Sequence, residues 1–240
     1  MSLLTMIQDA AREVGFELPN TVIGNNDATA RQLLALLNRE GKILSRRHNW
    51  TALQREYSFT TVASQEAYAL PEDFDRLLNQ TAWDRSQRRS LQGPVTPERW
   101  QAIKSGLGAG AGIDRRYRIR RGAALNNELI IDPIPASSGE SLVFEYISSH
   151  WCRDAAGETT NNNLTNDSDL PLLSEDLLTL GLVWRFLAAK GLSYQQAQLD
   201  YEREVAQAIA RDGGAAKLRL DNRSTPLLGS PQLPETGFGV

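Results

Sequence analysis

Apolar residues recur at helical spacing near the start of the chain and predict two helices. The first runs over residues 3–14 and stops at Gly15, a residue type that commonly ends helices. The second begins after Asp27, whose side chain can cap a helix, and continues to about His48. This second helix is long for a globular protein, where helices average about 10 to 14 residues.

From Trp50 onward the pattern changes from a helical to an alternating period. Residues 57–62 alternate in the manner of a half-buried strand. Glycine, proline, asparagine and serine separate further short runs, which predict strands at 68–70, 80–83, 116–119, 129–131 and 142–147. One helix interrupts these strands at 96–104, with Thr96 as its cap and Pro97 as its first helical residue.

Helical periodicity returns near residue 172. A helix over 172–190 is apolar nearly all round, so we expect it to be buried between neighbours, and Gly191 ends it. Ser193 and Gln196 have the spacing of a capping box for a last helix that reaches Gly213. Its apolar stripe consists of Tyr194, Ala197, Tyr201, Val205 and Ala208.

The order helices, strands, helices predicts an α+β fold. We expect residues 1–50 and 170–212 to form one helical bundle, because neither helical pair alone can cover both of its apolar faces. Residues 51–169 would be an inserted antiparallel β-sandwich or barrel-like domain. Residues 213–240 contain three prolines and no sustained period, which predicts an extended C-terminal arm.

Composition excludes several classes of protein. The 240 residues are 41% hydrophobic and 23% charged with a net charge of -3, which suits an ordinary globular chain and does not indicate bulk nucleic-acid wrapping. No transmembrane span and no secretory signal are expected, so synthesis and assembly would be cytoplasmic. A single cysteine and two histidines exclude a disulfide framework and a zinc-type ligand set, and no cofactor is expected.

Candidate catalytic groups are few and unspecific. Glu72, Asp73 and Asp75 offer carboxylate pairs that a cell-wall glycosidase would need, although acids in such a turn are usually solvated. Cys152 beside His150 is a possible thiol nucleophile, but a lone cysteine is more often a structural apolar residue. The glycine-rich run 106–112 lacks the lysine and hydroxyl residue of a phosphate loop, and we expect it to be a mobile loop.

An arginine row is the clearest electrostatic feature. It consists of Arg115, Arg116, Arg118, Arg120 and Arg121. If Tyr117 faces inward on a strand, three of these guanidinium groups share the opposite face, an arrangement that suits phosphate or carboxylate recognition. The row is therefore a candidate nucleic-acid or subunit-interface site, and a solvated edge strand guarded by charge is the simpler alternative.

Several strand and turn patterns resemble a known phage family. They are residues 68–74 (Tyr-Ala-Leu-Pro-Glu-Asp-Phe), residues 131–135 (Ile-Asp-Pro-Ile-Pro) followed by Gly139, residues 142–146 (Leu-Val-Phe-Glu-Tyr), and the closing helical pair. Together they resemble short-tailed phage head-to-tail adaptors, also called tail tubular protein A or tail accessory factor proteins. The resemblance covers about residues 1–212.

The resemblance implies a structural virion protein rather than an enzyme. Twelve copies would form a ring that joins the portal protein to the tail nozzle or tail tube protein, around a channel through which genomic DNA passes without sequence specificity. In that family a C-terminal segment often reaches onto the portal. The corresponding candidates in the arm are Leu218, Leu220, Pro226, Leu227, Leu228, Pro231, Leu233 and Phe238.

Overall fold

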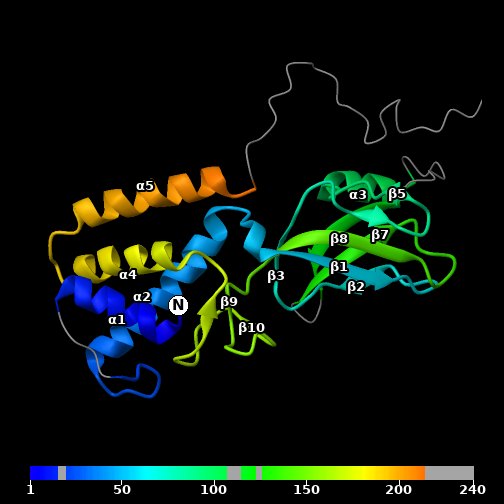
Figure 1. Cartoon of the computed structure of the whole chain (residues 1–240). Coiled ribbons are helices and arrows are strands. Elements are labelled where there is room, and N and C mark those ends of the chain that lie inside the picture. The colour runs from blue at the N-terminus through cyan, green and yellow to red at the C-terminus, as the bar shows by residue number, and fades with distance from the viewer. Residues whose placement is uncertain (16–19, 107–114, 123–125, 214–240) are drawn as a thin grey trace, which may run out of the picture.

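The computed structural model describes residues 1–15, 20–106, 115–122 and 126–213, which form two lobes that lie side by side (Figure 1). The helical lobe contains α1 (Leu3–Val14), α2 (Ala28–Arg47), α4 (Glu175–Ala189) and α5 (Gln195–Arg211). The sheet lobe contains two sheets and α3 (Pro97–Lys104). The fold is therefore α+β, with a sheet-rich part inserted between N-terminal and C-terminal helices, as the sequence predicts.

Helix α4 is the centre of the helical lobe. It packs against α1, α2 and α5, and its Leu178 and Leu182 are fully buried. Gly181 allows α2 to come close, because a Cβ atom there would lie 2.6 Å from Cγ of Glu40. The prediction that this apolar helix is buried between neighbours is confirmed.

The caps explain where most helices begin and end. Asp27 accepts a hydrogen bond from the Ala30 N–H at 2.9 Å at the start of α2, and Thr96 caps α3. Gly15 ends α1 with a φ of 96°, in the left-handed region that favours glycine. These three boundaries agree with the sequence-based prediction.

The starts of the last two helices differ from the prediction. Helix α4 begins at Glu175 rather than at 172, because β11 (Leu170–Pro171) pairs with β9 (Cys152–Arg153) just before it. The predicted capping box of α5 is wrong. The helix begins at Gln195 without a side-chain cap, and the Gln196 amide instead donates to the Asp200 carboxylate at 3.0 Å.

The first sheet of the sheet lobe has the order β1-β8-β4-β5, with β3 also paired to β8. Its strands are β1 (Gln54–Thr60), β3 (Phe74–Leu77), β4 (Trp83–Asp84), β5 (Arg89–Ser90) and β8 (Ser141–Ser148). Strand β4 is shorter than the predicted strand at 80–83, because Gln80 has a φ of 65° and belongs to a turn. Strand β3 was not predicted.

The second sheet has the order β2-β7-β6 and faces the first across a shared core. Its strands are β2 (Ala67–Ala69), β6 (Arg116–Arg121) and β7 (Asn127–Asp132). Tyr68 and Tyr117 from this sheet join Phe144 and Tyr146 from the other in one apolar cluster. The two sheets therefore pack as a sandwich.

A small third sheet joins the helical lobe to the chain that returns from β8. It consists of β9, β10 (Thr160–Asn161) and β11. The helical core includes Trp151, Cys152 and Leu164 from this returning segment and Ile147 from the end of β8. The buried Trp151 ring lies against Gly41 of α2.

Polar contacts also connect the lobes. The Arg76 guanidinium of β3 donates to the His48 carbonyl oxygen at 2.7 Å and to the Asn49 Oδ1 at 2.8 Å. On the other side of the junction, the Asp212 carboxylate accepts hydrogen bonds from the Thr51 N–H at 2.9 Å and the Thr51 hydroxyl at 2.6 Å. The end of α2 and the end of α5 are thus both held where the chain enters β1.

None of the helices in the described ranges has the length and apolar character needed to cross a membrane.

Candidate interaction surfaces

The arginine row lies on β6, at the side of the second sheet that α3 covers. Tyr117 points into the sandwich core, whereas Arg118 is paired with Ile130 in the strand register, and Ile130 packs against Trp100 and Ile103 of α3. Arg116, Arg118 and Arg120 therefore share one face of the strand.

The members of the row have different surroundings. The Arg115 guanidinium lies 3.1 Å from the Asp84 carboxylate and also pairs with Glu140, and only 16% of its side chain is exposed. Arg120 is 3.8 Å from Glu128 across the sheet, and Arg121 also has an interaction partner. The Arg115 ion pairs therefore lie inside the sheet lobe and stabilise it. Three members of the row, Arg115, Arg120 and Arg121, have interaction partners within the chain.

Arg118 and Arg116 remain available. Arg118 lines a groove of about 510 Å³ between β3 and β6, with Phe74 and Ile119 among its apolar neighbours. Within the described ranges its guanidinium makes no hydrogen bond or ion pair, and the buried Nε of Arg116 also has no partner there. A half-buried guanidinium without an acid partner is suited to bind a carboxylate or phosphate supplied by another molecule.

The arm candidates Leu218, Leu220, Pro226, Leu227, Leu228, Pro231, Leu233 and Phe238 lie outside the described residues, as does most of the glycine-rich run 106–112.

Four of the five exposed large apolar side chains among the described residues lie at two opposite ends of the molecule, and the fifth is Met1. Val62 and Ile134, with relative exposures of 49% and 45%, form the sheet tip; they lie on two loops joined by a 2.9 Å hydrogen bond from the Ser64 N–H to the Pro135 carbonyl. Leu192 and Leu199, at 51% and 61%, form the helix tip beside the turn from α4 to α5 (Figure 1). Neither tip was predicted from the sequence, although Ile134 between Pro133 and Pro135 was a usable signal.

Two of the three candidate catalytic carboxylates already interact with neighbouring side chains, and the third is exposed. The Tyr146 hydroxyl donates to the Asp73 carboxylate at 2.9 Å, Asp75 forms an ion pair with Arg76, and Glu72 is exposed. Burial raises the pKa of the Cys152 thiol to about 12, and the His150 ring bonds to Thr160 at 3.0 Å rather than to the thiol. The part of the chain that is described contains no group of three potential metal ligands.

The family model described as SU10 adaptor protein matches residues 1–228. The chain therefore belongs to the SU10 adaptor protein family, a family of phage adaptors, and the resemblance to phage adaptors noted in the sequence is confirmed. It is a structural component of the phage particle. No curated protein matches the chain.

Proposed function

We propose that the chain is one subunit of a ring that joins the portal protein of the phage head to the tail nozzle or tail tube protein. Twelve copies would form the ring, and genomic DNA would pass through its channel without sequence-specific contacts. Family membership supports the adaptor role. The main structural support is the position of the two apolar tips at opposite ends of one body.

We assign a different contact to each lobe. Residues 1–50 and 170–212 act as the helical domain around the channel, together with Trp151, Cys152 and Leu164 of the returning segment, which belong to the same core. The two large sheets of the inserted part, within residues 51–169, face the tail. The two tips differ in sequence and structure, so each suits a different partner. Neighbouring copies would meet through unlike faces, which is the kind of contact that closes a ring by rotation.

The arm over 213–240 extends the reach of this body toward the portal. A segment that becomes ordered on binding gains contact area at an entropic cost. Its apolar residues from Pro226 to Phe238 would supply that contact.

The arginine row would serve as an interface between copies. Arg118 and Arg116 lack acid partners in the described ranges, so a carboxylate of the next copy would form ion pairs with them. Phosphates of the DNA in the channel are the alternative acid. Affinity of the isolated chain for duplex DNA that falls steeply with salt would support the DNA contact instead.

We infer that the protein has no enzymatic role. Asp73 and Asp75 already hold Tyr146 and Arg76, and neither is left free to work as the acid or base of a glycosidase. A peptidoglycan-release assay should give no activity with the natural chain. Release that is lost in Asp73→Asn would contradict this inference.

Electron microscopy of the chain mixed with portal particles tests the main proposal. We expect ring-shaped density on the portal, with the sheet lobe directed away from the head. Failure to associate with the portal at any stoichiometry would reject the proposal.

A further inference from the structure

An apolar pocket of about 350 Å³ opens on the helical lobe next to the lobe junction. Its walls come from the end of α2, the start of α4 and the end of α5. The lining includes Leu44, Trp50, Leu172, Leu177, Ala208 and Asp212. Leu44 and Leu177 belong to the large helical core, so an apolar side chain placed in the pocket would extend that core.

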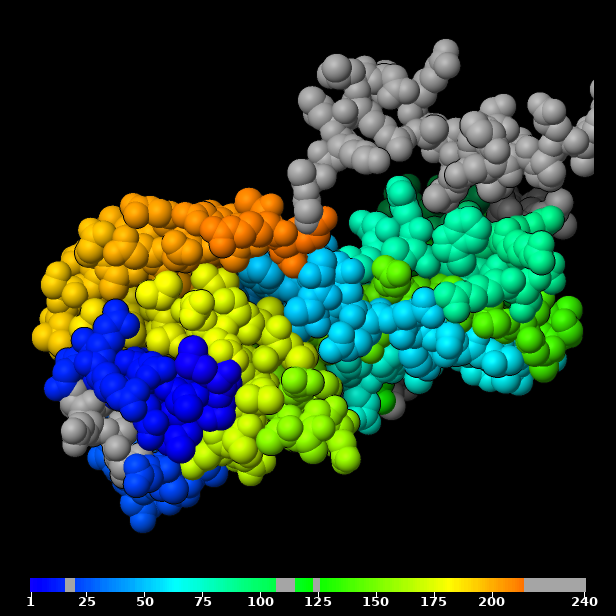
Figure 2. All heavy atoms as spheres, viewed as in Figure 1, coloured from blue at the N-terminus to red at the C-terminus, as the bar shows by residue number. Residues whose placement is uncertain are grey.

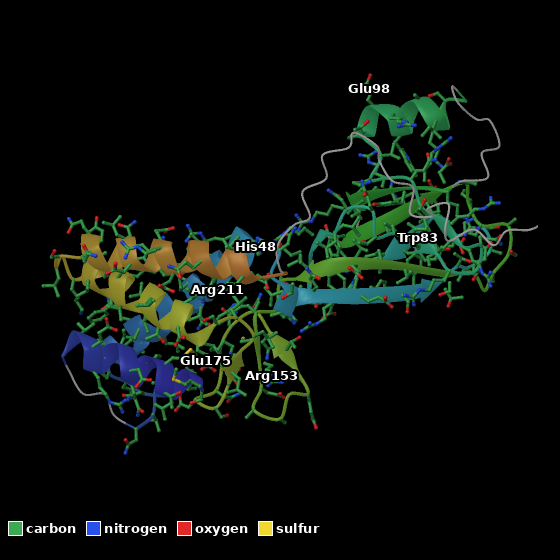
Figure 3. All side chains as sticks on the ribbon, turned by 45° about the horizontal axis from the view of Figure 1, so that its top comes forward. His48, Trp83, Glu98, Arg153, Glu175 and Arg211 are labelled. Atoms are coloured by element: carbon green, nitrogen blue, oxygen red, sulfur yellow. The ribbon has the colours of Figure 1, made fainter. Side chains whose placement is uncertain are left out.

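The C-terminal arm starts at the mouth of this pocket. Arg211 and Asp212 line the mouth, and Figure 3 shows Arg211 at the end of α5 that lies near His48. The two hydrogen bonds from Thr51 hold Asp212 in place. The backbone of Asp212 is already extended, with φ of -72° and ψ of 126°, and Gly213 follows with a φ of 75°.

The arm carries suitable apolar side chains close to this point. Leu218 and Leu220 alternate with charged residues, so both would lie on one side of an extended segment. Leu218 is the fifth residue after Gly213, and five residues of extended chain span at most about 17 Å. The leucine pair is therefore within reach of the pocket from which the arm departs.

We propose that Leu218 and Leu220 occupy the pocket of their own chain and anchor the root of the arm to the helical lobe. The same chain is favoured over a second copy, because a short tether gives an effective concentration in the millimolar range. Asp221 would then lie near the exposed Arg211, whose guanidinium bonds Gln207 at 2.7 Å. Residues 222–240 stay available to a partner, and the anchoring does not depend on the proposed ring.

A disulfide cross-link in the full-length chain tests the anchoring. Ser174 is exposed, lines the pocket and makes no capping hydrogen bond, and the side chain of residue 220 would point toward it from the arm. The double variant Ser174→Cys with Leu220→Cys keeps Leu218 as the anchor. The matched control is Ser174→Cys with Ser230→Cys, which places the second thiol further along the arm. The natural Cys152 is only 1% exposed and should not compete.

We expect the disulfide between positions 174 and 220 to form within one chain, at least roughly tenfold faster than in the control. Adding Leu218→Asp should reduce the rate to that of the control. Ala208→Phe, which fills the pocket, should do the same. Electrophoresis without reductant and mass spectrometry give the readout.

Equal rates for the two pairs would overturn the proposal. A covalent dimer instead of an internal cross-link would also overturn it, because the leucines would then belong to the pocket of a second copy. Cross-linking that survives both Leu218→Asp and Ala208→Phe would show that the pocket does not hold the arm.

Discussion

Cys152 lies inside the helical core, where only 1% of the residue is exposed. Burial, with the nearby Asp169 as a second cause, raises the pKa of the thiol to about 12. A raised pKa keeps the thiol neutral below that pH, so at pH 8 roughly one thiol in ten thousand is the reactive thiolate. We expect iodoacetamide to modify Cys152 at least about a hundredfold more slowly in the folded chain than in guanidinium chloride. Mass spectrometry measures both rates, and equal rates would show that the thiol is accessible.

Gly41 is required because the Trp151 ring occupies the space where a side chain would start. A Cβ atom at Gly41 would lie 2.4 Å from Cε2 of Trp151, and Trp151 is fully buried. In Gly41→Ala, a gain of about 1 kcal/mol in helix propensity opposes an overpacking cost of about 3 kcal/mol. The clash therefore dominates, and we expect urea unfolding to show a net loss of about 2 kcal/mol.

Gly15→Ala is the matched control for this substitution. Nothing lies within 4 Å of a Cβ at Gly15, but its φ of 96° strains any side chain. The control should lose about 1 kcal/mol. A Gly41→Ala chain that is as stable as the natural one would show that the Trp151 ring can move aside.

At the scale of elements, one buried polar network holds α5 onto the helical lobe. Glu40 of α2 is fully buried and accepts hydrogen bonds from Arg185 of α4 and from the Tyr201 hydroxyl of α5. Arg47 of α2 reaches the same hydroxyl at 3.5 Å. Burial and the Glu40 carboxylate both raise the pKa of Tyr201, so its hydroxyl stays protonated and donates. Figure 2 shows α5 at the outer surface of the helical lobe. Its hydrogen bond to Glu40 therefore helps to hold the helix against α2 and α4.

Removing the Tyr201 hydroxyl should weaken the attachment of α5. Tyr201→Phe removes the hydroxyl that donates to the buried Glu40 carboxylate, so one carboxylate oxygen loses its hydrogen bond. We expect the free energy of unfolding to fall by about 1 to 3 kcal/mol. Hydrogen exchange in α5 should rise as a result. Tyr194→Phe is the control, because Tyr194 also stacks near Trp184 but its hydroxyl makes no hydrogen bond within the described chain. Equal effects of the two substitutions would contradict this role for the network.

The same elements show what a sequence reveals by itself. Helices α1, α2 and α3 were predictable because their caps and periodicity are local. Strand β3 and the three short strands β9 to β11 were not, since each has only two to four residues and exists through distant partners. The shared face of the arginines follows from alternation, whereas their cover by α3 depends on a contact between Trp100 and Ile130 that alternation does not show. The burial of Glu40 depends on Arg185, which lies 145 positions away.

At the scale of the whole molecule, the lobe junction makes the two tips parts of one body. Arg76 fastens the sheet lobe to the end of α2, and Asp212 fastens the end of α5 to Thr51 at the entry to β1. A force applied at the sheet tip therefore reaches α2 and α5 through polar contacts as well as through the chain. Such a connection suits a protein that has to hold two partners at a constant separation.

The tips provide the sharpest test of this whole-molecule role. Val62→Asp with Ile134→Asp places two charges on the sheet tip, and Leu192→Asp with Leu199→Asp does the same on the helix tip. All four side chains are about half exposed, so folding should change little. Because the sheet tip is proposed to face the tail, its variant should lose at least about tenfold in affinity for the tail protein and keep its affinity for the portal. The helix-tip variant should show the opposite selectivity.

Ser58→Asp is the matched control, since Ser58 is exposed on β1 and belongs to neither tip. Binding to purified portal and tail proteins is measured separately for each variant, with the thermal midpoint of unfolding as a check on folding. If one variant loses binding to both the portal and the tail protein at an unchanged midpoint of unfolding, the two tips do not each bind a different partner. Full binding by both variants would exclude the tips as contact surfaces and leave the lateral faces and the arm to carry the adaptor's connections.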